Sequence, residues 1–403
     1  MTNAVLTPHD ARRAISRQGG PGLAVTSVDG PAHREFHLTL RPLPGEAPAF
    51  LIRRLAETLR EAGAAIVRQE IFGAVAAHGE VQDALWQALG EPDWPVTWVE
   101  GVDCAGGSVA GMHVWAVAGG AVETISQNGR PIGRVFSDGC ARHCVLGDVQ
   151  PDDLSAPKTV QARQTFENLE AALREAGMDM TQVVRTWLFL DDLLSWYSPF
   201  NSIRTEFYRQ WKMFDRLVPA STGVSGRNPA GSALTAGAWA VQPLTSALVL
   251  REVPSPLQCP ASAYGSSFSR ALELASPGQH RLLVSGTASI GPDGRTACVG
   301  DLHGQIELTM RVVQAILASR RLDFSDATRV TAYFKNLRDA PAFAAWCASR
   351  GLGQWPLVLA QSDICRDELL FELELDAIAP AGARRAGRAL AGASGAAAEG
   401  TVA

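Results

Sequence analysis

Leu-Arg-Glu-Ala-Gly occurs twice in this chain, at residues 59–63 and again at 173–177. Each copy closes a stretch with the apolar spacing of an amphipathic helix, over 50–62 and about 160–176. A third helix of the same kind is expected over about 304–320. These helices indicate an internal repeat, with one such helix in each copy.

Strand patterns repeat together with the helices. Apolar runs rich in β-branched and aromatic residues follow the second and third helices, at 183–190 and 327–334. Three prolines each open a later apolar run, and a similar triplet begins twenty residues after each proline. These are Pro95 with Trp115-Ala116-Val117, Pro219 with Trp239-Ala240-Val241, and Pro356 with Asp376-Ala377-Ile378. Three matches at one spacing favour a true repeat over a chance likeness between Ala-rich helices and apolar strands.

The repeat predicts the architecture. Each unit is expected to hold a helix, a strand, a second helix and a proline-started hairpin, which makes an α/β (α+β sandwich) fold with helices on one sheet face. The units are expected at 33–120, 125–250 and 260–380, the first being the most degenerate. The Gly/Pro-punctuated segment 1–32 and the Ala/Gly-rich tail 381–403 are expected to be poorly ordered.

The composition excludes several classes of protein. Of the 403 residues, 46% are hydrophobic and 19% charged, and the net charge of −5 disfavours binding to nucleic acid or anionic membranes. The sequence shows no secretory h-region and no apolar run of membrane-spanning length, so we expect a cytoplasmic protein whose seven cysteines are reduced. Cys140, His143 and Cys144 lack a second ligand pair at zinc spacing, and no nucleotide-binding glycine motif is present. We expect no metal and no cofactor.

This layout, with the final strand Glu-Leu-Glu-Leu-Asp-Ala-Ile at 372–378, resembles the YjgF/Rid family. Members of that family are small trimers with ligand sites between subunits, so the resemblance implies an intramolecular pseudo-trimer and a monomeric chain. In imine-hydrolysing members, an Arg two residues after the strand-opening proline binds the substrate carboxylate. The matching residues here are Thr97, Ser221 and Val358, which argues against ordinary imine deamination.

Four segments resemble the chorismatase family, which has tandem units of this type. They are Tyr-Gly-Ser-Ser-Phe-Ser-Arg at 264–270, Leu-Val-Ser-Gly-Thr-Ala-Ser-Ile at 283–290, Val-Pro-Ala-Ser-Thr-Gly at 218–223 and Cys-Arg-Asp-Glu-Leu-Leu-Phe-Glu at 365–372. The resemblance implies cleavage of the enolpyruvyl ether of chorismate to pyruvate and 3-hydroxybenzoate for secondary metabolism. It places the family's essential glutamate on Glu372, and Cys365 matches a cysteine of the hydroxybenzoate-forming branch.

Chorismate is a dianion with an acid-labile enol ether, so a catalyst needs a proton source and donors for two carboxylates. Glu372 lies in an alternating strand, and burial in a cleft would raise its pKa and keep it protonated near neutrality. We therefore predict that Glu372 is the general acid. Glu374 lies on the same face of the strand as Glu372 and remains an alternative candidate for the general acid. Cys365 is predicted to steer the reaction toward the aromatic product.

Several further residues are predicted to contact the substrate. They are Gly286, Thr287, Ala288, Thr222 and Gly223 around exposed backbone groups, Tyr208, Arg209, Arg216, Tyr264 and Arg270 as donors to carboxylates, and Gln361 to position water or a hydroxyl group. Three alternative functions stay open: hydrolysis of chorismate to 3,4-dihydroxycyclohexa-1,5-diene carboxylate, a non-catalytic YjgF-like ligand-binding or regulatory protein, and an atypical imine deaminase.

Overall fold

The computed structural model describes residues 15–30, 33–102 and 106–382, and within them the chain builds three six-stranded sheets. The first unit contains β1 (Ile15–Gly20), β2 (Leu23–Asp29), β3 (Arg34–Leu40), α1 (Pro48–Ala62), β4 (Ala65–Gly73), α2 (His78–Leu89), β5 (Val96–Glu100) and β6 (Val109–Ala118).

The second unit contains β7 (Glu123–Gln127), β8 (Arg130–Ser137), β9 (Ala141–Val149), α3 (Lys158–Glu175), β10 (Val183–Leu190), α4 (Leu193–Gln210), β11 (Ala220–Ser225) and β12 (Leu234–Pro243). The third contains β13 (Val249–Val253), β14 (Ala271–Ala275), β15 (Gln279–Ala288), α5 (Leu302–Ser319), β16 (Ala327–Phe334), α6 (Ala340–Ser349), β17 (Leu357–Gln361) and β18 (Phe371–Pro380).

One topology recurs in all three sheets. The strand orders are β1-β2-β3-β6-β4-β5, β7-β8-β9-β12-β10-β11 and β13-β14-β15-β18-β16-β17. In each, three antiparallel strands are followed by two strands that pair in parallel, and the last strand of the unit inserts between the two groups. The predicted α/β class and the tandem arrangement are therefore confirmed.

The repeated Leu-Arg-Glu-Ala-Gly motif ends a helix in both places. Gly63 and Gly177 follow α1 and α3 with φ of 58° and 70°, the left-handed region that glycine adopts without a Cβ clash. In α1, Leu51, Ile52 and Leu55 recur at helical spacing and are fully buried against the first sheet.

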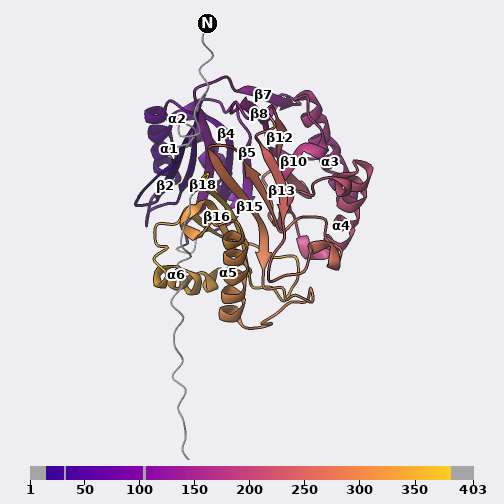
Figure 1. The fold of residues 1–403 in the computed structure, drawn as a ribbon. Helices are drawn as coiled ribbons and strands as arrows, with labels where there is room; N and C mark the ends of the chain where they lie inside the picture. Colours follow the sequence, from indigo (N-terminus) through magenta and orange to yellow (C-terminus); the bar gives the residue numbers. More distant parts are fainter. Residues whose placement is uncertain (1–14, 31–32, 103–105, 383–403) are drawn as a thin grey trace, which may run out of the picture.

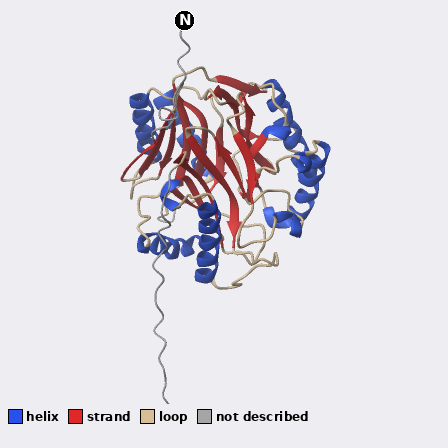
Figure 2. Cartoon of the chain, viewed as in Figure 1, coloured by secondary structure: helices blue, strands red, loops and turns tan. Residues whose placement is uncertain are grey.

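The helices lie outside the sheets, as Figure 1 and Figure 2 show, with α1 and α2, α3 and α4, and α5 and α6 in three separate places. Each pair covers one face of its own sheet and forms a separate apolar core with it. The opposite faces of the sheets meet in a shared core that includes Phe72, Trp115, Trp187, Trp239 and Tyr333. This junction brings strand faces from distant parts of the sequence together.

Two predictions about the architecture are wrong. The described part of segment 1–32 is ordered, because β1 and β2 pair along their full length and continue the first sheet through β3. The expected hairpins do not form either: β4 separates β5 from β6, and β10 and β16 do the same in the other units. The tail 383–403 lies outside the described residues.

No helix among the described residues has both the length and the apolar character needed to cross a lipid bilayer.

Candidate active site

Glu372 lies where the second and third sheets meet. Within the third sheet it stands on β18, opposite Ala288 on one side and Tyr333 on the other. From the second sheet, β11 crosses β15 at this point. The Ser221 backbone N–H donates to Ser285 Oγ at 2.9 Å, and the Gly286 N–H donates to Thr222 Oγ1 at 3.1 Å.

A pocket opens at this crossing. It is enclosed by α4 and β11 of the second unit and by loops and strands of the third. Its wall is formed by Tyr197, Arg204, Ser221, Gly223, Tyr264, Ser266, Phe268, Arg270, Gly286, Ala288, Ile290, Cys365 and Glu372. Seven of the residues predicted from the sequence are thus brought together: Glu372, Cys365, Tyr264, Arg270, Gly286, Ala288 and Gly223.

The Glu372 side chain is held in a form that can donate a proton. The residue is 5% exposed, and burial raises the pKa of its carboxyl group to about 8. Glu374 adds to this increase, whereas Arg185 and Arg270 oppose it. Gly286 leaves the space that the carboxyl group occupies, because a Cβ there would overlap the Glu372 oxygen. Glu372 is therefore largely protonated at neutral pH.

Glu374 faces a different environment two residues along the same strand. Burial would raise its pKa, but Arg329 and Arg185 outweigh that effect and hold the pKa well below its usual range. Both Arg side chains donate to its carboxylate at 2.6 Å, and Thr222 and Tyr333 donate at 2.5 and 3.0 Å. Glu374 is therefore an ionised, fully bonded carboxylate that has no proton to give.

Cys365 precedes Glu372 by seven residues and lines the same pocket. Burial, with a smaller contribution from the neighbouring Glu372, raises the pKa of its thiol to about 12 against the opposing effect of Arg366. The side chain is thus a neutral thiol at physiological pH, which makes it a weak hydrogen-bond donor and a poor nucleophile.

Two guanidinium groups face the pocket. Arg204 comes from α4 and donates to Asn201 Oδ1 at 2.5 Å, while its buried Nε has no hydrogen-bond partner. Arg270 donates from Nε and Nη2 to the Cys259 carbonyl, at 3.0 and 2.8 Å, and lies near the ring of Tyr264. A planar guanidinium matches a carboxylate, so this pocket can receive an anionic molecule.

Four other residues that the sequence predicts to contact the substrate do not line this pocket: Tyr208, Arg209, Arg216 and Gln361. Tyr208 is buried in the helix–sheet core of the second unit, and Arg209, one residue on, points to solvent. Arg216 is exposed and donates to Thr181 Oγ1 at 3.4 Å. Gln361 lies on the exposed end of β17, where it lines another hollow with Lys335 and Asp363.

Thr222 and Thr287 are close to the pocket but do not line it. Thr222 donates to Glu374 and accepts from the Gly286 N–H, so it links the two sheets behind the wall. Thr287 points away from its neighbours Gly286 and Ala288, because strand side chains alternate.

Reasoning from the sequence missed Tyr197, Arg204, Ser266 and Phe268 as pocket residues. Tyr197 and Arg204 are seven residues apart, which places them on one face of α4 with Asn201 between them. This spacing was a usable signal. Ser266 and Phe268 lie within the quoted segment 264–270, but only the structure shows that they face the pocket.

Comparisons with known proteins agree with this fold. Residues 147–228 match the family model described as Endoribonuclease L-PSP. A 3-hydroxybenzoate synthase from Streptomyces hygroscopicus is 25% identical over 243 residues, which cover 54% of this chain and 68% of the relative. A crystal structure of a chorismatase superposes with a TM-score of 0.58 at 20% identity, covering 77% of this chain and 92% of that chain.

The recurring sheet topology and the matched segment define the class, a tandem protein of L-PSP, or YjgF-like, units. Within that class, the chain is similar in sequence to the curated 3-hydroxybenzoate synthase and similar in fold to the chorismatase crystal structure.

Proposed function

We propose that this protein is an enzyme that cleaves the enolpyruvyl ether of chorismate to pyruvate and 3-hydroxybenzoate. The observation that carries the proposal is the protonated Glu372, whose pKa burial raises to about 8, in a pocket that also holds two guanidinium groups. An acid-labile enol ether needs such a proton donor near neutral pH. The relative named 3-hydroxybenzoate synthase supports the choice of product.

In the proposed reaction, Glu372 transfers its proton to the methylene carbon of the enolpyruvyl group. The ether carbon becomes an oxocarbenium ion, and the Glu372 carboxylate left behind lies close enough to stabilise that charge. Glu374, already ionised and bonded to Arg185 and Arg329, adds negative potential from behind the wall without giving up a proton. The two carboxylates therefore have separate roles.

Arg204 and Arg270 are proposed to hold the two substrate carboxylates. They reach the pocket from different units, Arg204 from α4 and Arg270 from the residue just before β14, so they can bind a dianion at two points. The unpartnered Nε of Arg204 is available for one of these bonds. Tyr197 and Tyr264 add hydroxyl groups to the same wall.

Cys365 is proposed to direct the outcome toward the aromatic product. Pyruvate and 3-hydroxybenzoate together contain all the atoms of chorismate, so this route consumes no water overall, whereas the dihydrodiol route consumes one molecule. A neutral thiol beside Glu372 is a less polar neighbour than a hydroxyl group and binds water more weakly. It would therefore disfavour attack by water.

The test is incubation of the purified full chain with chorismate, with pyruvate measured enzymatically and the ring product identified by chromatography. The proposal predicts pyruvate and 3-hydroxybenzoate in equal amounts. The dihydroxycyclohexadiene carboxylate as main product would support the hydrolytic alternative, and no pyruvate above the spontaneous rate would refute the activity. The monomeric state and the cytoplasmic location stay predictions.

A further inference from the structure

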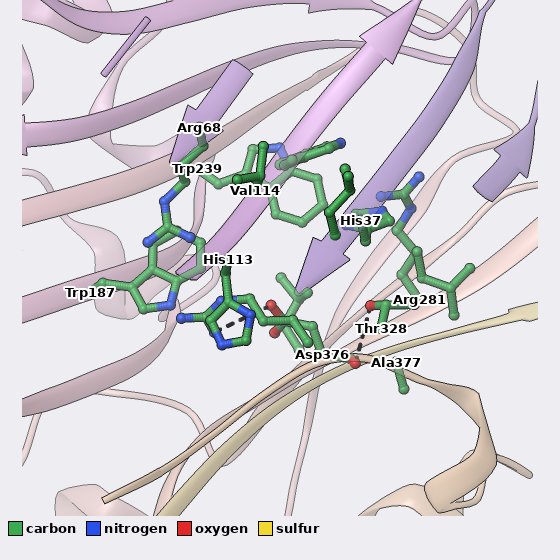
Figure 3. Close-up of a pocket in the computed structure, with 15 residues that line it drawn as sticks. His37, Arg68, His113, Val114, Trp187, Trp239, Arg281, Thr328, Asp376 and Ala377 are labelled. Atoms are coloured by element: carbon green, nitrogen blue, oxygen red, sulfur yellow. Dashed lines mark hydrogen bonds and ion pairs between the residues drawn. The ribbon is translucent and has the colours of Figure 1, made fainter. Parts of the chain in front are cut away.

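A second pocket, a cavity of about 40 Å³, lies where the three sheets meet. Its wall comes from all three units and includes His37, Arg68, His113, Trp115, Trp187, Trp239, Arg281, Arg329 and Asp376, several of which Figure 3 labels. It shares no lining residue with the pocket around Glu372. The proposed catalytic chemistry therefore gives it no role.

The arginines at this junction follow from the internal repeat. Arg68, Arg185 and Arg329 stand at the same place on β4, β10 and β16, each just after a register shift. Their strand partners are Trp115, Trp239 and Asp376. Three equivalent cationic positions therefore converge around one axis.

Positive charge dominates the wall of this pocket. Arg68, Arg281 and Arg329 line it, and Asp376 is its one carboxyl group among the described residues. The glutamates that pair with these arginines, Glu70, Glu374 and Glu35, are not part of the wall. A species in the pocket thus meets three guanidinium groups and the single carboxyl group of Asp376, while Glu70, Glu374 and Glu35 lie outside the wall.

Several N–H donors at this wall are buried and without a hydrogen-bond partner. They are Nε of Arg68, Nη1 of Arg329 and Nε1 of both Trp115 and Trp187, in residues that are 5%, 7%, 9% and 2% exposed. Nη1 of Arg329 lies 3.8 Å from Asp376 Oδ2, an ion pair beyond hydrogen-bond distance. Leaving such donors unbonded is costly. The matching unpartnered carboxylate acceptor at the wall is Oδ1 of Asp376.

Water molecules alone would not satisfy the excess of hydrogen-bond donors at this wall. A water molecule that accepts from these donors brings two protons of its own, which then need acceptors at a wall where donors are in excess. An anion accepts from every side and brings no proton that needs an acceptor. The space is narrow, since the Arg68 guanidinium lies 3.4 Å from the centre of a Trp187 ring and the Trp115 and Trp239 rings are 4.9 Å apart. The occupant must therefore be small.

We propose that the junction of the three sheets binds a small monovalent anion of the halide class. The anion accepts from Arg68, Arg329, Trp115 and Trp187 and supports the packing of the three units around their common axis. This site is structural and lies apart from the pocket around Glu372.

The test measures thermal unfolding of the full chain at constant ionic strength, with sodium chloride or sodium bromide replacing sodium gluconate, whose anion is too large for the pocket. The account predicts a saturable rise in the unfolding midpoint of about 2 °C or more with either halide. A second measurement is anomalous scattering from crystals grown in bromide, which should place a peak between Arg68 and Trp115.

A pair of variants separates this site from a general salt effect. Trp115→Phe removes one N–H donor and keeps an aromatic ring, so it should raise the halide concentration for half-maximal stabilisation by about tenfold. Trp86→Phe changes a Trp that is 48% exposed on α2 and should leave that concentration unchanged.

A stabilisation that is equal for gluconate and halides, or absent, together with no bromide peak at the junction, would overturn the proposal and leave water as the occupant. If Trp115→Phe does not fold, the bromide peak in the unmodified protein still decides the question.

Discussion

Glu372 and Glu374 point to the same face of β18, yet their surroundings drive their pKa values in opposite directions. Burial without a close cation partner raises the pKa of Glu372 to about 8, whereas Arg185 and Arg329 keep the pKa of Glu374 far below that value. The period of the strand predicts that the two side chains share a face. It does not predict their protonation, because Arg185 lies on another sheet, 189 residues away.

The raised pKa gives the reaction a pH dependence. An acid must be protonated to act, so kcat/KM for chorismate should be constant below the Glu372 pKa and fall as the pH rises through about 8. The measurement is the initial rate of pyruvate release at low chorismate concentration between pH 6 and about pH 10, a range chosen to span that pKa. A rate that increases through pH 8 would show that the group acts as a base.

A change at Cys365 should alter the product more than the rate. In Cys365→Ala the partly buried, neutral thiol beside Glu372 is replaced by a methyl group, which leaves space for water. We expect pyruvate release to continue while the ring product shifts from 3-hydroxybenzoate toward the dihydroxycyclohexadiene carboxylate. Chromatography of the products measures the ratio, and Cys298→Ala, at an exposed cysteine, is the control. An unchanged ratio would remove Cys365 from this role.

Helix α4 shows at the level of a single element how the site is built. Its regular geometry is interrupted at Trp196, and Pro199 follows inside the helix, where it cannot donate a backbone hydrogen bond. Beyond that point Asn201 fixes Arg204, which reaches the pocket. The helix could be predicted from its spacing, but the exposed Arg209 was as good a candidate as Arg204 until the packing of the second unit was known.

Loss of Arg204 should weaken substrate binding. Arg204→Gln removes a charge-assisted bond to a substrate carboxylate, typically worth about 1.5–3 kcal/mol, so KM should rise by about tenfold to a hundredfold. Arg209→Gln, on the solvent face of the same helix, serves as the matched control and should change KM little. Steady-state kinetics with chorismate test both variants. Equal effects of the two substitutions would mean that Arg204 does not contact the substrate.

The sequence predicts the buried strands but not the exposed ones. Buried runs such as β10 and β16 are identifiable because each is rich in β-branched and aromatic residues. β1 was missed because most of its side chains are exposed, so that pairing with β2, rather than burial, holds it in the sheet. The position of each unit's last strand depends on pairing between distant segments, which spacing along the chain does not encode.

At the scale of the whole molecule, buried charges join the three units. Glu374 of the third sheet accepts from Arg185 of the second, and Arg329 of the third bridges Glu374 to Glu70 of the first. The spacing of the repeats predicts three units. The charge network at their junction could not be predicted, because it depends on which strand faces approach one another.

Breaking this network should destabilise the protein. Glu374→Gln leaves two buried guanidinium groups short of a charge partner, and removing one member of a buried ion pair typically costs about 3–5 kcal/mol of the free energy of unfolding. Urea denaturation at pH 7 measures the loss. Glu372→Gln is the matched control, because that carboxyl group is largely neutral at pH 7 and its replacement should cost much less. Equal losses would contradict the assigned protonation states.

The central claim is that Glu372 donates the proton that breaks the enol ether of chorismate, and one comparison tests it most directly. Pyruvate release from chorismate is measured for the unmodified protein, for Glu372→Gln and for Glu368→Gln, an exposed residue just before β18. The account predicts rapid release by the unmodified protein and by Glu368→Gln, and a rate at least about a hundredfold lower for Glu372→Gln. Full activity in Glu372→Gln would contradict the account.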